Sequence, residues 1–110
     1  MEQNPLFKEI EQTINDNNVV VFMKGTADFP QCGFSAAVAQ IFQHLQVDFK
    51  DVNILEREGL RPALNEYANW PTSPKIYVKG EFIGGCDIIR EMFETGELQD
   101  LLKEKGLLAA

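Results

Sequence analysis

Five consecutive apolar residues, Val19 to Met23, constrain the fold of this chain more than any other feature of its sequence. Such a run predicts a strand that is covered on both faces, because a strand with one exposed face alternates apolar and polar residues. Amphipathic helices can supply the cover, since apolar residues follow helical spacing from Leu6 to Ile14 and again from Val38 to Leu45. We therefore expect a buried strand between layers of helices.

The remaining patterns place further helices and strands after this strand. The expected elements are a strand at 47–50, a helix at 60–67, a hairpin of strands at 76–78 and 82–83, and helices at 88–93 and 98–102. Asp87 can cap the helix at 88–93, and Gly96 ends it. A helix between the first two strands requires parallel pairing, and the hairpin adds an antiparallel pair. We expect an α/β fold of the thioredoxin kind, with a four-stranded mixed sheet flanked by helices on both faces.

Length and charge narrow the class of protein. A chain of 110 residues fits one compact domain. Its formal net charge of −7 argues against nucleic-acid binding, which needs a basic surface. No apolar run reaches the roughly 18 to 20 residues of a membrane-spanning helix, and residues 1–12 lack the basic and apolar stretches of a targeting peptide. We expect a cytoplasmic protein without a nucleic-acid or membrane partner.

The two cysteines, Cys32 and Cys86, must be considered separately. With the one histidine, His44, they provide too few ligands for a structural zinc site. A disulfide between them is not expected either, because cysteines of cytosolic domains are usually reduced.

Cys32 stands where the helix that carries Val38 and Leu45 is expected to begin. Free N–H groups and the positive end of the helix dipole stabilise a thiolate at such a position. Lys24, at the end of the buried strand, can add a cation nearby. These features favour a reactive thiolate over the alternative interpretation, an inert buried cysteine.

Ser35 occupies the position at which a C-x-x-C redox motif has its second cysteine. A second thiol releases a mixed disulfide by attacking it, and a serine cannot do so. Cys32 therefore needs an external thiol for its release, or it serves as a metal ligand. The alternative role of Ser35 is that of an ordinary early-helix serine that bonds nearby backbone.

Four motifs follow one another in the order and spacing of a known family. They are Lys24-Gly25-Thr26, Cys32-Gly33-Phe34-Ser35, Trp70-Pro71-Thr72-Ser73-Pro74 and Gly84-Gly85-Cys86-Asp87. Together they resemble the monothiol glutaredoxins of the CGFS type. The resemblance implies that residues 1–110 form a single glutaredoxin domain with a thioredoxin fold. It also implies a glutathione site beside Cys32 and a homodimer that shares one [2Fe–2S] cluster, used in iron–sulfur cluster assembly, storage or transfer.

The resemblance also assigns roles to single residues. Cys32 is the expected catalytic nucleophile and metal ligand, and the residues expected to bind glutathione are Lys24, Phe34, Arg61, Thr72, Ser73, Pro74, Gly85, Cys86 and Asp87. The two cations would hold the glycine carboxylate, the Ser73 backbone before a cis-proline would pair with the tripeptide, and the helix start at Asp87 would bind its γ-glutamyl end. By themselves, Lys24 and Arg61 are equally typical of solvated surface residues, and Asp87 of an N-cap.

Ligand counting is consistent with this assignment. A [2Fe–2S] cluster takes four thiolates or their equivalents. Cys32 from two chains and two glutathione thiols give four ligands, and so do Cys32 and Cys86 from two chains. We prefer glutathione because the other motifs suit a tripeptide with two carboxylates and one amine.

Three positions differ from the usual family pattern. Ala27 stands in place of a proline, Ser73 in place of a bulky apolar residue, and Lys75 in place of a glutamine. The hydroxyl at position 73 removes apolar cover beside the expected cluster. We hypothesise that Lys75 attracts a glutathione carboxylate.

Three functions remain open at this point. The first is a cluster carrier, for which the family implies a BolA-type protein and apo iron–sulfur proteins as partners. The second is a glutathione-dependent oxidoreductase that uses Cys32 as the nucleophile, and the third is an interaction module without chemistry. The sequence favours the carrier, with at most weak oxidoreductase activity, because Ser35 removes the intramolecular route of disulfide release.

Overall fold

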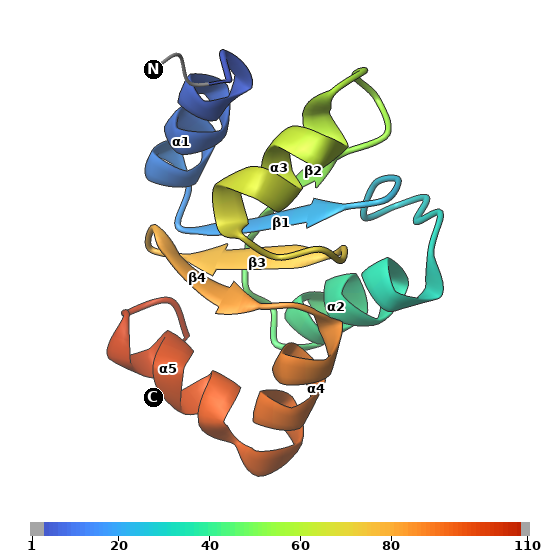
Figure 1. Cartoon of the computed structure of the whole chain (residues 1–110). Coiled ribbons are helices and arrows are strands. Elements are labelled where there is room, and N and C mark those ends of the chain that lie inside the picture. Colours follow the sequence, from blue (N-terminus) through green and yellow to red (C-terminus); the bar gives the residue numbers. More distant parts are fainter. Residues whose placement is uncertain (1–3, 109–110) are drawn as a thin grey trace.

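The computed structural model describes residues 4–108, so that positions 1–3 and 109–110 of the expected domain lie outside the described residues. The elements in chain order are α1 (Leu6–Asp16), β1 (Val19–Met23), α2 (Gly33–His44), β2 (Lys50–Asn53), α3 (Leu60–Ala68), β3 (Lys75–Val78), β4 (Glu81–Gly84), α4 (Cys86–Thr95) and α5 (Glu97–Glu104) (Figure 1). The strand order is β2-β1-β3-β4. β1 pairs in parallel with β2 and antiparallel with β3, and β3 forms a hairpin with β4. Within the described range, no helix is both long and apolar enough to span a membrane.

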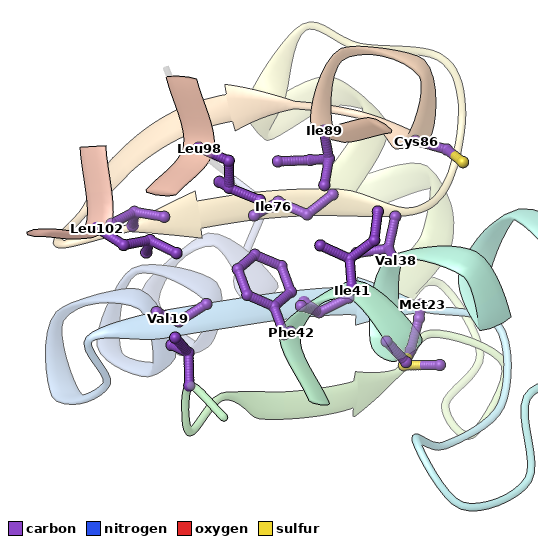
Figure 2. Close-up of a cluster of buried hydrophobic side chains, with 14 residues drawn as sticks. Val19, Met23, Val38, Ile41, Phe42, Ile76, Cys86, Ile89, Leu98 and Leu102 are labelled. Atoms are coloured by element: carbon purple, nitrogen blue, oxygen red, sulfur yellow. The ribbon is translucent and has the colours of Figure 1, made fainter. Parts of the chain in front are cut away.

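All residues of β1 are buried because helices cover both faces of the sheet. Val19, Val21 and Met23 pack in a cluster with residues of α2, α4 and α5 (Figure 2). Val20 and Phe22, which alternate with them, pack in a second cluster with residues of α1 and α3. Figure 1 shows the same arrangement, with α1 and α3 on one side of the sheet and α2, α4 and α5 on the other. The expected mixed four-stranded α/β fold of the thioredoxin kind is confirmed.

The expected strand at 47–50 is wrong, because β2 spans Lys50–Asn53. Val47 and Phe49 pack in the core where the chain leaves α2, which explains the apolar residues at these two positions. The Val47 N–H donates to the carbonyl of Phe42 at 3.1 Å, so this segment closes the end of the helix and does not pair with a strand. The alternation of apolar and polar residues at 47–50 therefore arises from the connection between α2 and β2, whose apolar side chains face the core.

The start of α4 also differs from the expectation. Gly85, and not Asp87, is the N-cap residue, and the helix begins at Cys86. Asp87 is the second residue of the helix, where its negative charge still interacts favourably with the helix dipole. The expected break between the last two helices is confirmed, since Gly96 has a φ of 88° and separates α4 from α5.

Candidate functional site

Cys32 lies at the N-terminus of α2 as its N-cap residue, and its side chain is half-buried. The backbone N–H of Ser35 does most to hold the pKa of the Cys32 thiol below its ordinary value. Burial opposes this effect, while the N–H of Phe34 and the charge of Lys24 support it. The helix start therefore favours the thiolate, the form that attacks disulfides and binds metals.

Ser35 is fully buried, and its hydroxyl oxygen accepts a hydrogen bond from the N–H of Lys24 at 3.1 Å. This bond joins the end of β1 to the first turn of α2, which fixes Cys32 relative to the sheet. The serine hydroxyl thus has a structural partner, in keeping with the interpretation of Ser35 as an early-helix serine that bonds backbone.

The loop between Lys24 and Cys32 is held by side chains of β2 that the sequence did not single out. The Asn53 side-chain oxygen accepts from the N–H of Gly25 at 3.0 Å, and an Asp51 carboxylate oxygen accepts from the N–H of Ala27 at 2.8 Å. The alternate polar residues of β2 could have indicated this role. They were not recognised because the strand was predicted at 47–50 and not at its true position.

A cavity of about 670 Å³ opens beside Cys32. The residues that line it are Lys24, Cys32, Phe34, Arg61, Trp70, Pro71, Thr72, Ser73, Gly85, Cys86, Asp87 and Ile88. All the sequence-predicted site residues are among them except Pro74, which is buried and follows a cis Ser73–Pro74 bond. Four stretches that are distant in the sequence therefore meet at one cavity.

The cavity combines cations, a carboxylate and an unpaired stretch of backbone. Lys24 comes from the end of β1, Arg61 from the first turn of α3 and Asp87 from the first turn of α4. Within residues 4–108, the backbone of Ser73 makes no hydrogen bond. An extended, zwitterionic peptide could pair with this backbone and place its charged ends on the ionic side chains.

Cys86 is the first residue of α4 and is 8 % exposed (Figure 2). Burial raises the pKa of the Cys86 thiol, although the charge of Arg90 acts in the opposite direction. The two cysteines line the same cavity but differ in character, because Cys32 is the more exposed thiol and the more acidic in tendency. Both are free thiols.

Trp70 and Gly85 make the cavity wall close-packed. A Cβ at position 85 would lie 3.2 Å from Nε1 of Trp70 and 3.3 Å from the carbonyl oxygen of Pro74. The Trp70 ring also packs edge-on against Phe82, at 5.4 Å between ring centroids. A Cβ at this position would require these neighbours to shift by a few tenths of an ångström, so glycine lets the start of α4 lie close to the segment before β3.

The hypothesis that Lys75 contacts a ligand carboxylate directly is not supported by its position. Lys75 is buried and does not line the cavity. Its ammonium donates to the side-chain oxygen of Asn65 at 2.6 Å and to the carbonyl of Thr72 at 2.7 Å.

The described residues do not form a complete metal site by themselves. No group of three or more His, Cys, Asp or Glu side chains in residues 4–108 is placed to hold a metal ion.

Comparisons with known proteins agree with this geometry. A family model described as Glutaredoxin matches residues 19–83. A probable monothiol glutaredoxin 2 of Rickettsia typhi is 45% identical over 108 residues, which cover 98% of this chain and 97% of the relative. The chain belongs to the glutaredoxin family. The resemblance to monothiol glutaredoxins is thereby confirmed. This glutaredoxin is also 60% identical over 91 residues to the chloroplastic monothiol glutaredoxin-S14 of Arabidopsis thaliana. The match covers 83% of this chain but only 53%, about half, of that relative.

Solved structures of glutaredoxins have the same fold. The solution structure of reduced poplar apo GrxS14 superimposes with a TM-score of 0.80 at 50% identity, covering 90% of this glutaredoxin and 91% of the poplar chain. The crystal structure of a buckwheat glutaredoxin–glutathione complex gives a TM-score of 0.81 at 27% identity, covering 94% and 92% of the two chains.

Proposed function

We propose that this glutaredoxin binds glutathione in the cavity beside Cys32 and, as a homodimer, carries a [2Fe–2S] cluster in iron–sulfur cluster assembly, storage or transfer. The observation that carries the proposal is the convergence of a thiol of lowered pKa, two cations and a carboxylate on one cavity. The buckwheat glutaredoxin of the same fold was crystallised with glutathione, which supports the ligand. We further propose that residues 1–110 act as one glutaredoxin domain.

Glutathione suits the chemistry of the cavity. Its thiol would lie beside Cys32, and Lys24 and Arg61 would bind its glycine carboxylate through charge-assisted hydrogen bonds. Its extended backbone would pair with the free backbone of Ser73. The N–H groups at the start of α4 would take the γ-glutamyl carboxylate, while Asp87 faces the amine.

Binding can be tested with S-methylglutathione, which has no free thiol, by titration calorimetry. Arg61→Met should weaken binding about 10- to 150-fold, because a hydrogen bond to a charged group contributes about 1.5–3 kcal/mol. Lys50→Met is the matched control, since Lys50 is an exposed lysine on β2 that does not line the cavity. Equal affinities of the Arg61→Met variant and the wild type would contradict the proposed site.

The cluster would be ligated by Cys32 from each of two protomers and by two glutathione thiols. The residues fit this role, because each chain offers one accessible thiol of lowered pKa and Ser35 provides no competing thiol. The buried Cys86, whose pKa is raised, is the weaker candidate for the remaining positions. The bound cluster would supply iron and sulfide as a unit for an acceptor protein.

Anaerobic reconstitution with and without glutathione tests the ligand set. We expect an iron–sulfur chromophore and a dimer only when glutathione is present, loss of both in Cys32→Ser, and retention of both in Cys86→Ser. A chromophore that forms without glutathione and disappears in Cys86→Ser would establish the rival set of four cysteines instead.

A second function, glutathione-dependent disulfide reduction, is supported by the partial exposure and lowered pKa of Cys32. Its thiolate would attack the glutathione sulfur of a glutathionylated protein and release the protein thiolate. A second glutathione thiolate would then release Cys32 and form glutathione disulfide, because Ser35 cannot. Fast turnover of a glutathionylated peptide by the cluster-free protein would favour this enzyme over the carrier.

The proposed partners are a BolA-type protein and apo iron–sulfur proteins. Phe29 and Phe34, which precede and follow Cys32 in the sequence, are 75% and 59% exposed and provide apolar surface. Exposed aromatic side chains beside a reactive thiol are suited to a protein contact. Phe29→Ser should slow cluster transfer to an apo-acceptor while cluster loading stays unchanged.

We also propose that the protein acts in the cytoplasm, since both of its cysteines are free thiols, as is usual in a reducing compartment.

A further inference from the structure

Lys75 is a buried cation that the proposed glutathione site leaves unexplained. It is the first residue of β3 and is only 1% exposed. Its ammonium donates to the side-chain oxygen of Asn65 on α3 and to the backbone carbonyl of Thr72 in the segment before β3. These bonds measure 2.6 and 2.7 Å, so the ammonium lies directly between the helix and the segment.

Among the described residues, no carboxylate forms an ion pair with Lys75. Within residues 4–108 the only ion pair joins Arg57 and Glu9. The charged group that acts on Lys75 from α3 is Arg61, another cation, and its cross-strand neighbour on β1 is the apolar Phe22. Burial, and then the charge of Arg61, lowers the pKa of Lys75 to about 8. A buried cation without an anionic partner costs stability, which directs attention to the two groups that it binds.

Of the two groups bound by Lys75, the carbonyl of Thr72 belongs to the cavity lining, and Asn65 lies on the helix that carries Arg61. Thr72 lines the cavity together with Ser73. Asn65 stands one helical turn after Arg61, which lines the cavity from α3, and residues four apart share a helix face. Lys75 therefore connects the helix that carries Arg61 to the segment that carries the Ser73 backbone.

We propose that Lys75 is a positioning residue for glutathione, which holds Arg61 and the Ser73 backbone at a fixed spacing through Asn65 and Thr72. The inference rests on the proposed function, because it requires a ligand that spans both walls. Lys75 does not touch this ligand, since it lies outside the lining of the cavity. Its effect is to order the site before binding, which spares the ligand the entropic cost of ordering it.

The protonation of Lys75 provides a readout that a purely structural residue would not affect. Hydrogen bonds from a charged amine are roughly twice as strong as those from a neutral one. The charge is present below the pKa of about 8 and lost above it. The affinity of the wild type for glutathione should therefore fall as the pH rises through this value, and a variant without a titrating group at position 75 should lack this part of the pH dependence.

The experiment compares Lys75→Met and Lys75→Gln with the wild type and with the exposed-lysine control Lys50→Met. The dissociation constant of S-methylglutathione is measured on both sides of pH 8. We expect about tenfold weaker binding in Lys75→Met, about threefold in Lys75→Gln, whose amide can still donate, and no change in the control. Any titration of the ligand itself is common to all four proteins and cancels in the ratios.

A second measurement does not depend on the ligand. Backbone order parameters of Thr72 and Ser73 in the ligand-free proteins should be lower in Lys75→Met than in the wild type and unchanged in Lys50→Met. If the wild type fails to bind S-methylglutathione, the proposed function is wrong, and the order parameters alone decide whether Lys75 positions the segment.

The remaining outcomes also decide the inference. If Lys75→Met does not fold, Lys75→Gln and Asn65→Ala take its place. Asn65→Ala removes one acceptor and should weaken binding more in the wild type than in the Lys75→Gln background, where a neutral amide makes the weaker bond. Wild-type affinity, pH profile and order parameters in a folded Lys75→Gln protein would overturn the inference.

Discussion

Replacing Gly25 by alanine should destabilise the protein by about 3 kcal/mol. Gly25 has a φ of +86°, and a left-handed conformation costs a residue with a Cβ roughly 1–2 kcal/mol. The added Cβ would lie 2.5 Å from the carbonyl oxygen of Phe29 and 2.6 Å from the nitrogen of Gln31, which are backbone atoms that cannot rotate away. Relief therefore requires a shift of the loop that loosens the hydrogen bonds from Gly25 to Asn53 and from Gln31 to Lys24, each worth about 1 kcal/mol.

Urea and thermal unfolding measure this effect. For a domain of this size, 1 kcal/mol corresponds to about 4 °C in melting temperature, so we expect a fall of about 12 °C for Gly25→Ala. Gly33→Ala is the matched control, because a Cβ there meets no atom within 4 Å and alanine favours the helix. The control should be as stable as the wild type or slightly more so.

The same substitution should disturb the thiol, because the loop leads directly into Cys32. A displaced Lys24 supports the thiolate less, so the pKa of Cys32 should rise in Gly25→Ala. If the free energy of unfolding of Gly25→Ala lies within about 1 kcal/mol of the wild-type value, the loop does not depend on glycine at this position.

Three further predictions concern residues around the site. Ser35→Ala leaves the part-buried N–H of Lys24 without its acceptor and should cost about 1–2 kcal/mol in urea unfolding; an unchanged midpoint would contradict it. Lys24→Met removes a favourable charge and should raise the pKa of Cys32, measured by thiolate absorbance during a pH titration. The pKa of Lys75 falls from 10.5 to about 8 on folding. The free energy of unfolding of the wild type relative to Lys75→Met should therefore rise between these pH values, by up to about 3 kcal/mol. A difference that does not change with pH would show that Lys75 is not buried in its charged form.

The sequence predicted the layers of this fold because they follow from burial alone. The uninterrupted apolar run of β1 requires cover on both faces, and the helical spacing before and after it supplies that cover. The position of Cys32 at a helix start was equally readable, since a loop with glycine and proline precedes an apolar helical pattern.

The parts that could not be predicted depend on tertiary contacts. Val47 and Phe49 alternate like a strand because both face the core, while the true strand β2 carries Asp51 and Asn53, whose polar side chains hold a loop. Lys75 reads as an exposed cation in any single-sequence analysis, since only the fold reveals that α3 and the segment before β3 enclose it. The sequence pattern indicates which apolar residues are buried, but it does not show which polar side chains the fold encloses or what they bind.

The cavity beside Cys32 is lined by residues that extend from Lys24 to Ile88 along the chain. Its walls are joined to one another through the central strands, so the cavity is complete only when β1 is paired with β3. An unfolded or partly folded chain consequently presents the thiol without the pocket, and any ligand of the assembled pocket stabilises the whole domain by mass action. Unfolding should therefore release any ligand that is bound in this cavity.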